Sequence, residues 1–198
     1  MDSKLTLHPI HKKVAYLEYK KQQQPVFYYP TGLYVENLCS CYEQLDRMFS
    51  YHRKVTVVMI QFHQYQYSHD NKQLSTLMSR LISKLKSHYQ SKRIGYFWAR
   101  EEGSNGKLHY HAAIMLNGSV CKSPFFIHQH AKAIWETLFP QNYVWLPKRS
   151  TFLLSRNELV SCELRKARMR LSYFAKKETK ESVPFGTKKF GCSQIKVR

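Results

Sequence analysis

A succession of strand-like and helix-like hydrophobic patterns from residue 54 onward constrains the fold of this chain more than any other feature. Residues 54–62 are rich in β-branched side chains and predict a buried strand. An apolar stripe at helical spacing then runs from Leu74 to about Tyr89. Two strand-like runs, 94–101 and 107–116, flank Gly103-Ser104-Asn105-Gly106, which is typical of a hairpin turn.

A second helix and a last strand complete the series. Apolar residues from Ile127 to Phe139 recur at helical spacing before Pro140, and a strand is expected within 143–154, interrupted at Pro147. The order strand-helix-strand-strand-helix-strand predicts an α+β, ferredoxin-like fold. Its antiparallel sheet should carry both crossover helices on one face. We expect the other face to stay open, as a place where a site could be built.

The segments on either side of this series extend the domain. Residues 36–52 predict an amphipathic helix, and residues from about Glu158 to Lys180 predict a long C-terminal helix. We interpret residues 1–34, which are basic and aromatic without clear periodicity, as an N-terminal arm. Residues 35–198 then form a single domain, which suits a chain of 198 residues.

The charge of the chain points to a polyanionic partner. Thirty-two Lys and Arg residues against 13 Asp and Glu residues give a net charge of +19, and the commonest partner of such a chain is nucleic acid. The apolar runs are too short to span a bilayer, and the first residues show no cleavable signal. We therefore expect a cytoplasmic protein without a membrane partner. The five cysteines form no Cys-x-x-Cys pair, which argues against a cysteine zinc site.

His109 and His111 lie two residues apart in the second hairpin strand. Because side chains alternate along a strand, both imidazoles project from one face, with Cα atoms about 7 Å apart. A three-residue loop with Gly106 in the left-handed conformation would place Glu101 opposite His109. Another loop length would place Arg100 there and let Glu102 reach the site. We favour Glu101, because two imidazoles and a carboxylate suit a divalent cation. The alternative is a pair of exposed strand histidines without a metal.

The expected C-terminal helix carries Tyr173 within a basic stripe. Its buried stripe is predicted to consist of Val160, Leu164, Ala167, Leu171 and Phe174. Cationic residues and Tyr173 recur on another side of the helix, namely Lys166, Arg170, Tyr173, Lys177 and Lys180, with Lys176 one turn from Tyr173. Cations stabilise a tyrosine phenolate and attract phosphate to it. The alternative is a half-exposed tyrosine without a catalytic role.

Together these motifs resemble the HUH endonucleases of rolling-circle replication and conjugation. Within that group the chain looks most like the replication initiators of filamentous phages (the inovirus gene-2 type) and their prophage-element relatives. The resemblance spans about residues 50–196. Its motifs are Trp98-Ala99-Arg100-Glu101, His109-Tyr110-His111, Tyr173-Phe174-Ala175-Lys176 and Lys189-Phe190-Gly191-Cys192-Ser193.

The resemblance implies a metal-dependent, site-specific DNA nickase that starts rolling-circle replication in a bacterial host. His109 and His111, with Glu101, would hold Mg²⁺ or Mn²⁺. Tyr173 would attack the scissile phosphate to form a 5′-phosphotyrosyl bond, assisted by Lys176. The expected partner is single-stranded or stem-loop origin DNA. A host helicase is also expected, since the chain has no ATP-binding phosphate loop.

One departure from the larger phage initiators affects the expected mechanism. Many of them carry two tyrosines a helical turn apart, whereas positions 176 and 177 are lysines here. A second subunit is therefore a candidate participant in termination. Two other readings stay open, namely a non-catalytic single-stranded DNA- or RNA-binding module and a nuclease that uses activated water. His63 is either a plain surface histidine or an outer ligand. Tyr96, Phe97 and Trp98 are candidates for stacking on bases, although we expect at least one of them to pack in the core.

Overall fold

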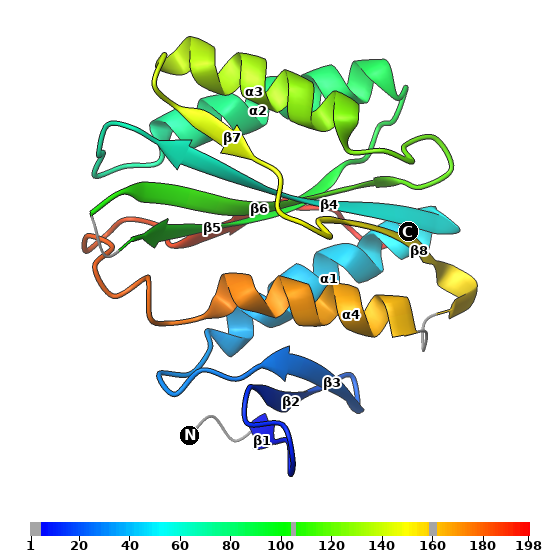
Figure 1. Cartoon of the computed structure of the whole chain (residues 1–198). Coiled ribbons are helices and arrows are strands. Elements are labelled where there is room, and N and C mark those ends of the chain that lie inside the picture. The colour runs from blue at the N-terminus through cyan, green and yellow to red at the C-terminus, as the bar shows by residue number, and fades with distance from the viewer. Residues whose placement is uncertain (1–4, 104–105, 159–161) are drawn as a thin grey trace.

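The computed structural model describes residues 5–103, 106–158 and 162–198 (Figure 1). Its larger sheet is antiparallel, with strand order β7-β4-β6-β5-β9 and with β8 also paired to β4. The strands are β4 (Lys54–Gln64), β5 (Gly95–Glu102), β6 (Leu108–Asn117), β7 (Tyr143–Trp145), β8 (Thr151–Ser155) and β9 (Phe190–Cys192). Ser104 and Asn105 of the expected hairpin turn lie outside the described residues.

Two crossover helices cover one face of this sheet, as the sequence predicts. Helix α2 (Lys72–His88) connects β4 to β5, and helix α3 (Phe125–Leu138) connects β6 to β7 (Figure 1). Strand β6 lies between β4 and β5 and is antiparallel to both. The predicted α+β fold with an antiparallel sheet is therefore confirmed, in the split arrangement of ferredoxin-like folds.

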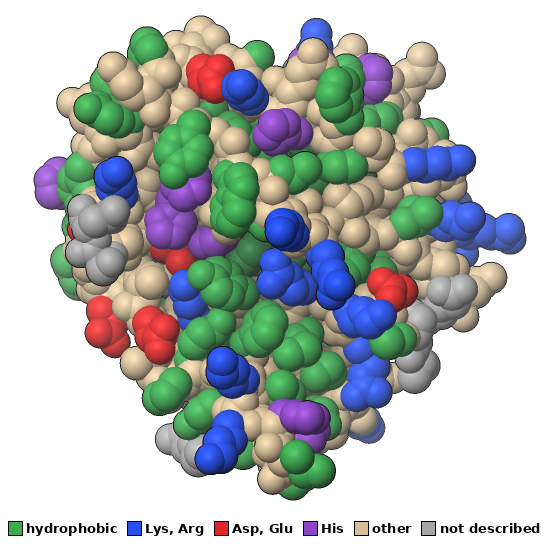
Figure 2. All heavy atoms as spheres, in the orientation of Figure 1, with side chains coloured by type: hydrophobic (Ala, Val, Ile, Leu, Met, Phe, Trp, Pro, Cys, Tyr) green, Lys and Arg blue, Asp and Glu red, His purple; other side chains and the backbone are tan. Residues whose placement is uncertain are grey.

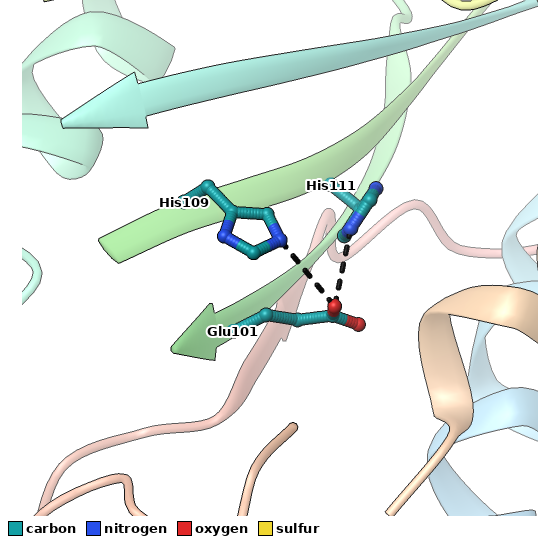
Figure 3. Close-up of side chains that lie close together, drawn as sticks. All are labelled: Glu101, His109 and His111. Atoms are coloured by element: carbon teal, nitrogen blue, oxygen red, sulfur yellow. Dashed lines mark ion pairs between the residues drawn. The ribbon is translucent and has the colours of Figure 1, made fainter. Parts of the chain in front are cut away.

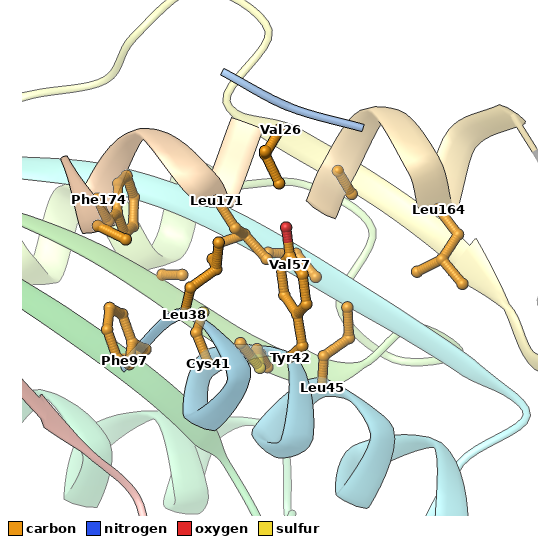
Figure 4. Close-up of a cluster of buried hydrophobic side chains, with 14 of the residues drawn as sticks. Val26, Leu38, Cys41, Tyr42, Leu45, Val57, Phe97, Leu164, Leu171 and Phe174 are labelled. Atoms are coloured by element: carbon orange, nitrogen blue, oxygen red, sulfur yellow. The ribbon is translucent and has the colours of Figure 1, made fainter. Parts of the chain in front are cut away.

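The opposite face is not open, and that part of the prediction is wrong. Helices α1 (Val35–Tyr51) and α4 (Cys162–Ser172) lie against it (Figure 1). Tyr42 of α1 and Leu171 of α4 meet Val57 of β4 in a buried apolar cluster (Figure 4). Strand β4 is apolar on both sides. Val57 faces α1 and α4, whereas Val58 and Ile60 are buried under α2 and α3. Such a strand needs cover on both faces.

Residues 5–27 form a small sheet within the segment that the sequence led us to interpret as an N-terminal arm. Strands β1 (Leu5–Leu7), β2 (Val14–Tyr19) and β3 (Gln22–Phe27) pair in order, and β3 packs on α4. Every second residue of β2 is buried, namely Ala15, Leu17 and Tyr19. These side chains belong to the same apolar cluster as Tyr42. The small sheet therefore adds a layer to the core that α1 and α4 form.

The C-terminal helix is shorter than the sequence predicts. Helix α4 ends at Ser172, a single 3-10 turn follows over Tyr173–Ala175, and the backbone is extended at Lys176. Ser172 Oγ accepts a hydrogen bond from the Phe27 N–H, which fixes the helix end against β3. The predicted buried stripe is confirmed for Leu164, Ala167, Leu171 and Phe174, whereas Val160 lies outside the described residues. No helix within the described ranges is long and apolar enough to cross a membrane.

Candidate metal centre and tyrosine site

A row of polar and aromatic side chains crosses the main sheet on the face toward α4. The strand register pairs Tyr143 of β7 with His63 of β4, His63 with His109 of β6, and His109 with Glu101 of β5. Directly paired residues lie on the same face, so the four side chains are neighbours. The rings of Tyr143 and His63 are stacked with centroids 4.2 Å apart, and those of His63 and His109 lie 5.4 Å apart.

A second row lies beside the first, one step further along the strands. Trp145 of β7 pairs with Gln61 of β4, and Gln61 pairs with His111 of β6. His63 therefore lies beside His109, whereas Gln61 lies beside His111, and His63 Nε2 is 3.3 Å from Gln61 Oε1. Burial and the neighbouring His109 lower the pKa of His63 to about 4, so its ring is neutral at pH 7.

Glu101, His109 and His111 form a compact group that could hold a metal ion. One ligand atom from each residue lies within 4.8 Å of the others. Glu101 Oε2 is 3.5 Å from His109 Nε2 and 3.2 Å from His111 Nε2, and the three side chains point toward one another (Figure 3). The predicted hairpin register is confirmed, with Gly106 at φ +69°. Glu102 pairs with Leu108, on the opposite face of the hairpin.

The donor atoms of this group fit a divalent cation. His111 Nε2 is buried and has no hydrogen-bond partner within the described part of the chain, and Glu101 Oε2, also buried, has only ion-pair contacts with the two imidazoles and with Lys176 Nζ. Leaving a buried imidazole nitrogen unpaired is costly, and a cation would accept lone pairs from both atoms. Burial lowers the pKa of His111 although the Glu101 carboxylate opposes this, so the ring is neutral at pH 7. Neutral imidazole is the form that binds metals.

Two buried lysines hold the same carboxylate from its other side. Lys180 Nζ donates hydrogen bonds to Glu101 Oε1 at 2.7 Å and to the Lys176 carbonyl at 3.0 Å. Lys176 Nζ lies 3.2 Å from Glu101 Oε2. Burial opposes ionisation of Glu101, but the two imidazoles and Lys180 outweigh it and hold the pKa of this carboxyl well below its usual range. Oε1 is thus occupied by Lys180, while Oε2 faces the histidines.

The pKa values of the two lysines shift in opposite directions, although burial acts to lower both. Burial lowers the pKa of Lys180 to about 8 although Glu101 opposes this. For Lys176 burial is outweighed by Glu101 and by Tyr173, so the pKa of Lys176 lies above its usual value. Lys176 is therefore a permanent cation at pH 7, placed between the carboxylate and the tyrosine.

Tyr173 reaches this group from the turn that follows α4. Its hydroxyl accepts a hydrogen bond from Lys176 Nζ at 2.7 Å, and its ring centroid lies 5.1 Å from that of His111. The expected pairing of Tyr173 with Lys176 is therefore present, although both residues lie beyond the last residue of the helix. Lys176 thus places a positive charge directly at the Tyr173 hydroxyl oxygen.

The expected basic stripe of the C-terminal helix is only partly present. Lys166 and Arg170 lie on α4, whereas Lys177 and Lys180 follow the helix. The sequence offered no sign that Lys180 would be buried against Glu101, because the two residues meet only through the non-helical segment that follows Tyr173–Ala175. Predicting this contact would have required knowing that α4 ends at Ser172.

The expected core role within Tyr96, Phe97 and Trp98 is confirmed. Phe97 and Trp98 are buried in the two apolar clusters, and Tyr96 is partly buried. Tyr29, from the segment interpreted as an arm, lies with its ring centroid 6.4 Å from that of Tyr173. Trp145 is exposed beside the site.

The fold and this site define a class of α+β protein in which one end of an antiparallel sheet gathers a candidate metal centre and a tyrosine bonded to lysine. The chain belongs to the YagK/YfjJ C-terminal domain family, whose model matches residues 18–193. This is a family of prophage-associated proteins. No curated protein and no solved structure matches the chain.

Proposed function

We propose that this protein is a metal-dependent, site-specific DNA nickase that initiates rolling-circle replication of a phage or prophage-like element. The observation that carries the proposal is the position of Tyr173 beside a candidate metal centre. Its ring lies 5.1 Å from the His111 ring, and its hydroxyl shares Lys176 with Glu101. The net charge of +19 and the membership of a prophage-associated family support DNA as the substrate.

Each residue of the site has a distinct task in this proposal. Glu101, His109 and His111 would hold a divalent cation, Mg²⁺ or Mn²⁺. The cation, when bound, supplies Lewis-acid polarisation of a phosphate oxygen. Lys180 fixes the Glu101 carboxylate so that Oε2 stays directed at the two imidazoles. This preorganisation spares the site a rearrangement during the reaction.

The covalent step exchanges one phosphate ester for another. The Tyr173 hydroxyl oxygen attacks phosphorus in line, the new bond joins it to the 5′-phosphate, and the bond to the 3′-oxygen breaks. The phenol proton leaves to water, and the departing 3′-oxygen takes a proton from water to become a hydroxyl that can prime synthesis. Lys176, 2.7 Å from the Tyr173 oxygen, would neutralise the negative charge that develops during the step. Because an ester is retained, the strand can be rejoined without ATP.

The proposed cycle requires partners. Unwinding would come from a host helicase.

Termination depends on how many nucleophiles one subunit offers. Of the tyrosines, all within the described residues, Tyr173 is the one bonded to a lysine that also contacts Glu101. Termination would therefore use the released 3′-hydroxyl or Tyr173 of a second subunit. Mixing wild-type protein with the Tyr173→Phe variant should then lower circle release more than initial nicking.

The proposal is tested by incubating the protein with end-labelled stem-loop DNA and Mn²⁺ and separating the products on a denaturing gel. We expect a covalent protein–DNA adduct that maps to Tyr173 by mass spectrometry and disappears in EDTA. Metal-dependent cleavage without an adduct would instead identify a nuclease that uses activated water. Binding of the DNA without any cleavage would identify the non-catalytic binding module.

A further inference from the structure

A groove of about 880 Å³ opens beside the tyrosine site, between α4 and the connection from β7 to β8. A smaller cavity of about 210 Å³ is lined by His111 and Tyr173. Trp145, Pro147 and Arg170 line both spaces, so the groove continues to the tyrosine that we propose as the nucleophile. A ligand in the groove would therefore extend from the reacting phosphate along α4.

Cations dominate the charge of this groove. Its lining includes Lys148, Arg149, Lys166 and Arg170, against the single carboxylate of Glu163, which pairs with Lys166 at 2.7 Å. On the face shown in Figure 2, Lys and Arg side chains form a band beside the histidines, over α4 and the connection that follows β7. The groove is thus complementary to a chain of phosphates.

Arg170 has unused hydrogen-bonding capacity at the junction of the two spaces. Its Nε atom is buried and has no hydrogen-bond partner within the described ranges. The Oγ1 atom of Thr151, which also lines the groove, is likewise buried and has no hydrogen-bond partner among the described residues. Buried polar atoms without partners are uncommon in native proteins, and a bound ligand can satisfy them.

The groove also presents an aromatic side chain to solvent at its inner end. Of the three tryptophans, all within the described part of the chain, Trp98 and Trp135 are buried, whereas Trp145 is 52% exposed. Tyr143 lies on the same face of strand β7 and is 53% exposed. Exposed aromatic rings flanked by cations bind unpaired bases by stacking, which bases inside a duplex cannot offer.

We propose that this groove binds the unpaired DNA strand adjoining the scissile phosphate, with Trp145 stacking on a base and with Arg170, Lys148 and Arg149 contacting phosphates. The choice of DNA rests on the proposed nickase function. The preference for an unpaired strand rests on Trp145 and its cationic surroundings. Lys166 contributes less, because Glu163 already neutralises it.

The test measures binding separately from cleavage. Anisotropy of a short fluorescein-labelled oligo-dT and of a duplex of equal length is followed in EDTA, on the full-length chain carrying Tyr173→Phe. Adding Trp145→Ala should weaken oligo-dT binding by roughly 5- to 150-fold, the range for loss of one base–aromatic stack. Trp145→Phe keeps a stacking ring, so it should retain affinity to within a few-fold. Because Trp145→Phe removes the tryptophan in the groove, it should also lose the quenching of tryptophan fluorescence by oligo-dT.

A matched pair of charge variants tests the phosphate contacts. Lys148→Gln with Arg149→Gln should reduce the salt dependence of oligo-dT binding by about 1.4 in log–log slope, the value for two phosphate contacts on a single strand. Lys84→Gln with Lys86→Gln removes the same charge from exposed positions of α2 on the other side of the sheet, and should leave the slope unchanged.

Two results would overturn the groove assignment. One is unchanged oligo-dT affinity in Trp145→Ala, and the other is duplex binding that is equally tight and equally dependent on Trp145. These outcomes are separable from the fate of the nickase proposal. An adduct at Tyr173 with Trp145-independent binding refutes the groove alone. Trp145-dependent binding without any adduct in the wild-type protein refutes the nickase alone.

Discussion

The two faces of the main sheet use the same end of β6 in opposite ways. Toward α2 and α3, Leu108 and Tyr110 are buried within an apolar cluster. The Tyr110 hydroxyl is bonded there to Asn71 and Arg100. Toward α4, the alternating residues His109 and His111 gather around a buried carboxylate. One strand segment therefore serves the core on one side and a candidate reaction site on the other.

The lengths of the covering helices account for this difference. Helix α4 ends at Ser172, and the ring centroid of Phe174 lies 5.4 Å from that of His111, at the border between the apolar cluster and the polar site. The residues that follow the helix, Tyr173, Lys176 and Lys180, contribute their side chains to the site. The site therefore occupies the space where a covering helix ends. Substitutions of His109, His111 or Tyr173 should change chemistry, whereas substitutions of Leu108 or Tyr110 should change stability.

The largest effect is expected from Tyr173→Phe. This substitution removes the proposed nucleophilic oxygen and one hydrogen bond from a half-buried residue, so the fold and DNA binding should persist. Adduct formation and nicking should fall by at least about 10³-fold, as for loss of an essential nucleophile. The measurement is the yield of covalent adduct on a denaturing gel. An adduct that still forms and maps to Tyr29, the neighbouring tyrosine, would contradict the assignment.

Loss of either histidine of the His-x-His motif should abolish nicking with little loss of DNA affinity. His109→Ala and His111→Ala each remove one proposed metal ligand, whereas affinity depends on many phosphate contacts. Gel assays of nicking in Mn²⁺ and anisotropy in EDTA would separate the two effects. His128→Ala on α3 is the matched control and should behave like wild type. Nicking by wild-type protein in EDTA would refute the metal centre.

Glu101→Ala should be the most destabilising change at the site. It leaves Lys180, which is fully buried, without its carboxylate, and breaking a buried ion pair costs about 3–5 kcal/mol. Adding Lys180→Met to Glu101→Ala removes the uncompensated charge and should restore much of the loss in free energy of unfolding, measured in urea. The neighbouring Glu102→Ala should change it by less than about 0.5 kcal/mol. Equal effects of Glu101→Ala and Glu102→Ala would contradict the register.

The sequence predicted the central sheet and its crossover helices well, because the hydrophobic residues of these elements recur with a clear period. The hairpin from Gly95 to Asn117 even yielded the pairing of Glu101 with His109, since Gly106 takes the left-handed conformation that the loop requires. The small N-terminal sheet was missed for a physical reason. Its tight turn uses Lys20 and Lys21, both with positive φ, where Asn-Gly would have signalled a hairpin.

The sequence predicted only those parts of the site that depend on the alternation of side chains along a strand. His109, His111 and Glu101 share a face because of their positions in two paired strands, which sequence reveals. Lys180 and Trp145 join them through the end of α4 and through the pairing of β7 with β4. Neither contact follows from a local pattern. The sequence predicts Tyr173, Lys177 and Lys180 on one continuous helical stripe, yet tertiary contacts override helix propensity after Ser172.

The smallest expected effect comes from Tyr110→Phe, the counterpart of Tyr173→Phe on the opposite face. Tyr110 lies between the two histidines, and its hydroxyl donates to Asn71 Oδ1 at 3.0 Å and accepts from Arg100 Nη1 at 3.2 Å. Because Arg100 keeps its bonds to the Asp70 carbonyl and to Asn71, losing the hydroxyl should cost about 1–2 kcal/mol of stability. Nicking at a temperature where the protein stays folded should match wild type. A large loss of nicking in Tyr110→Phe, with unchanged stability in urea, would show that the two faces are not functionally separate.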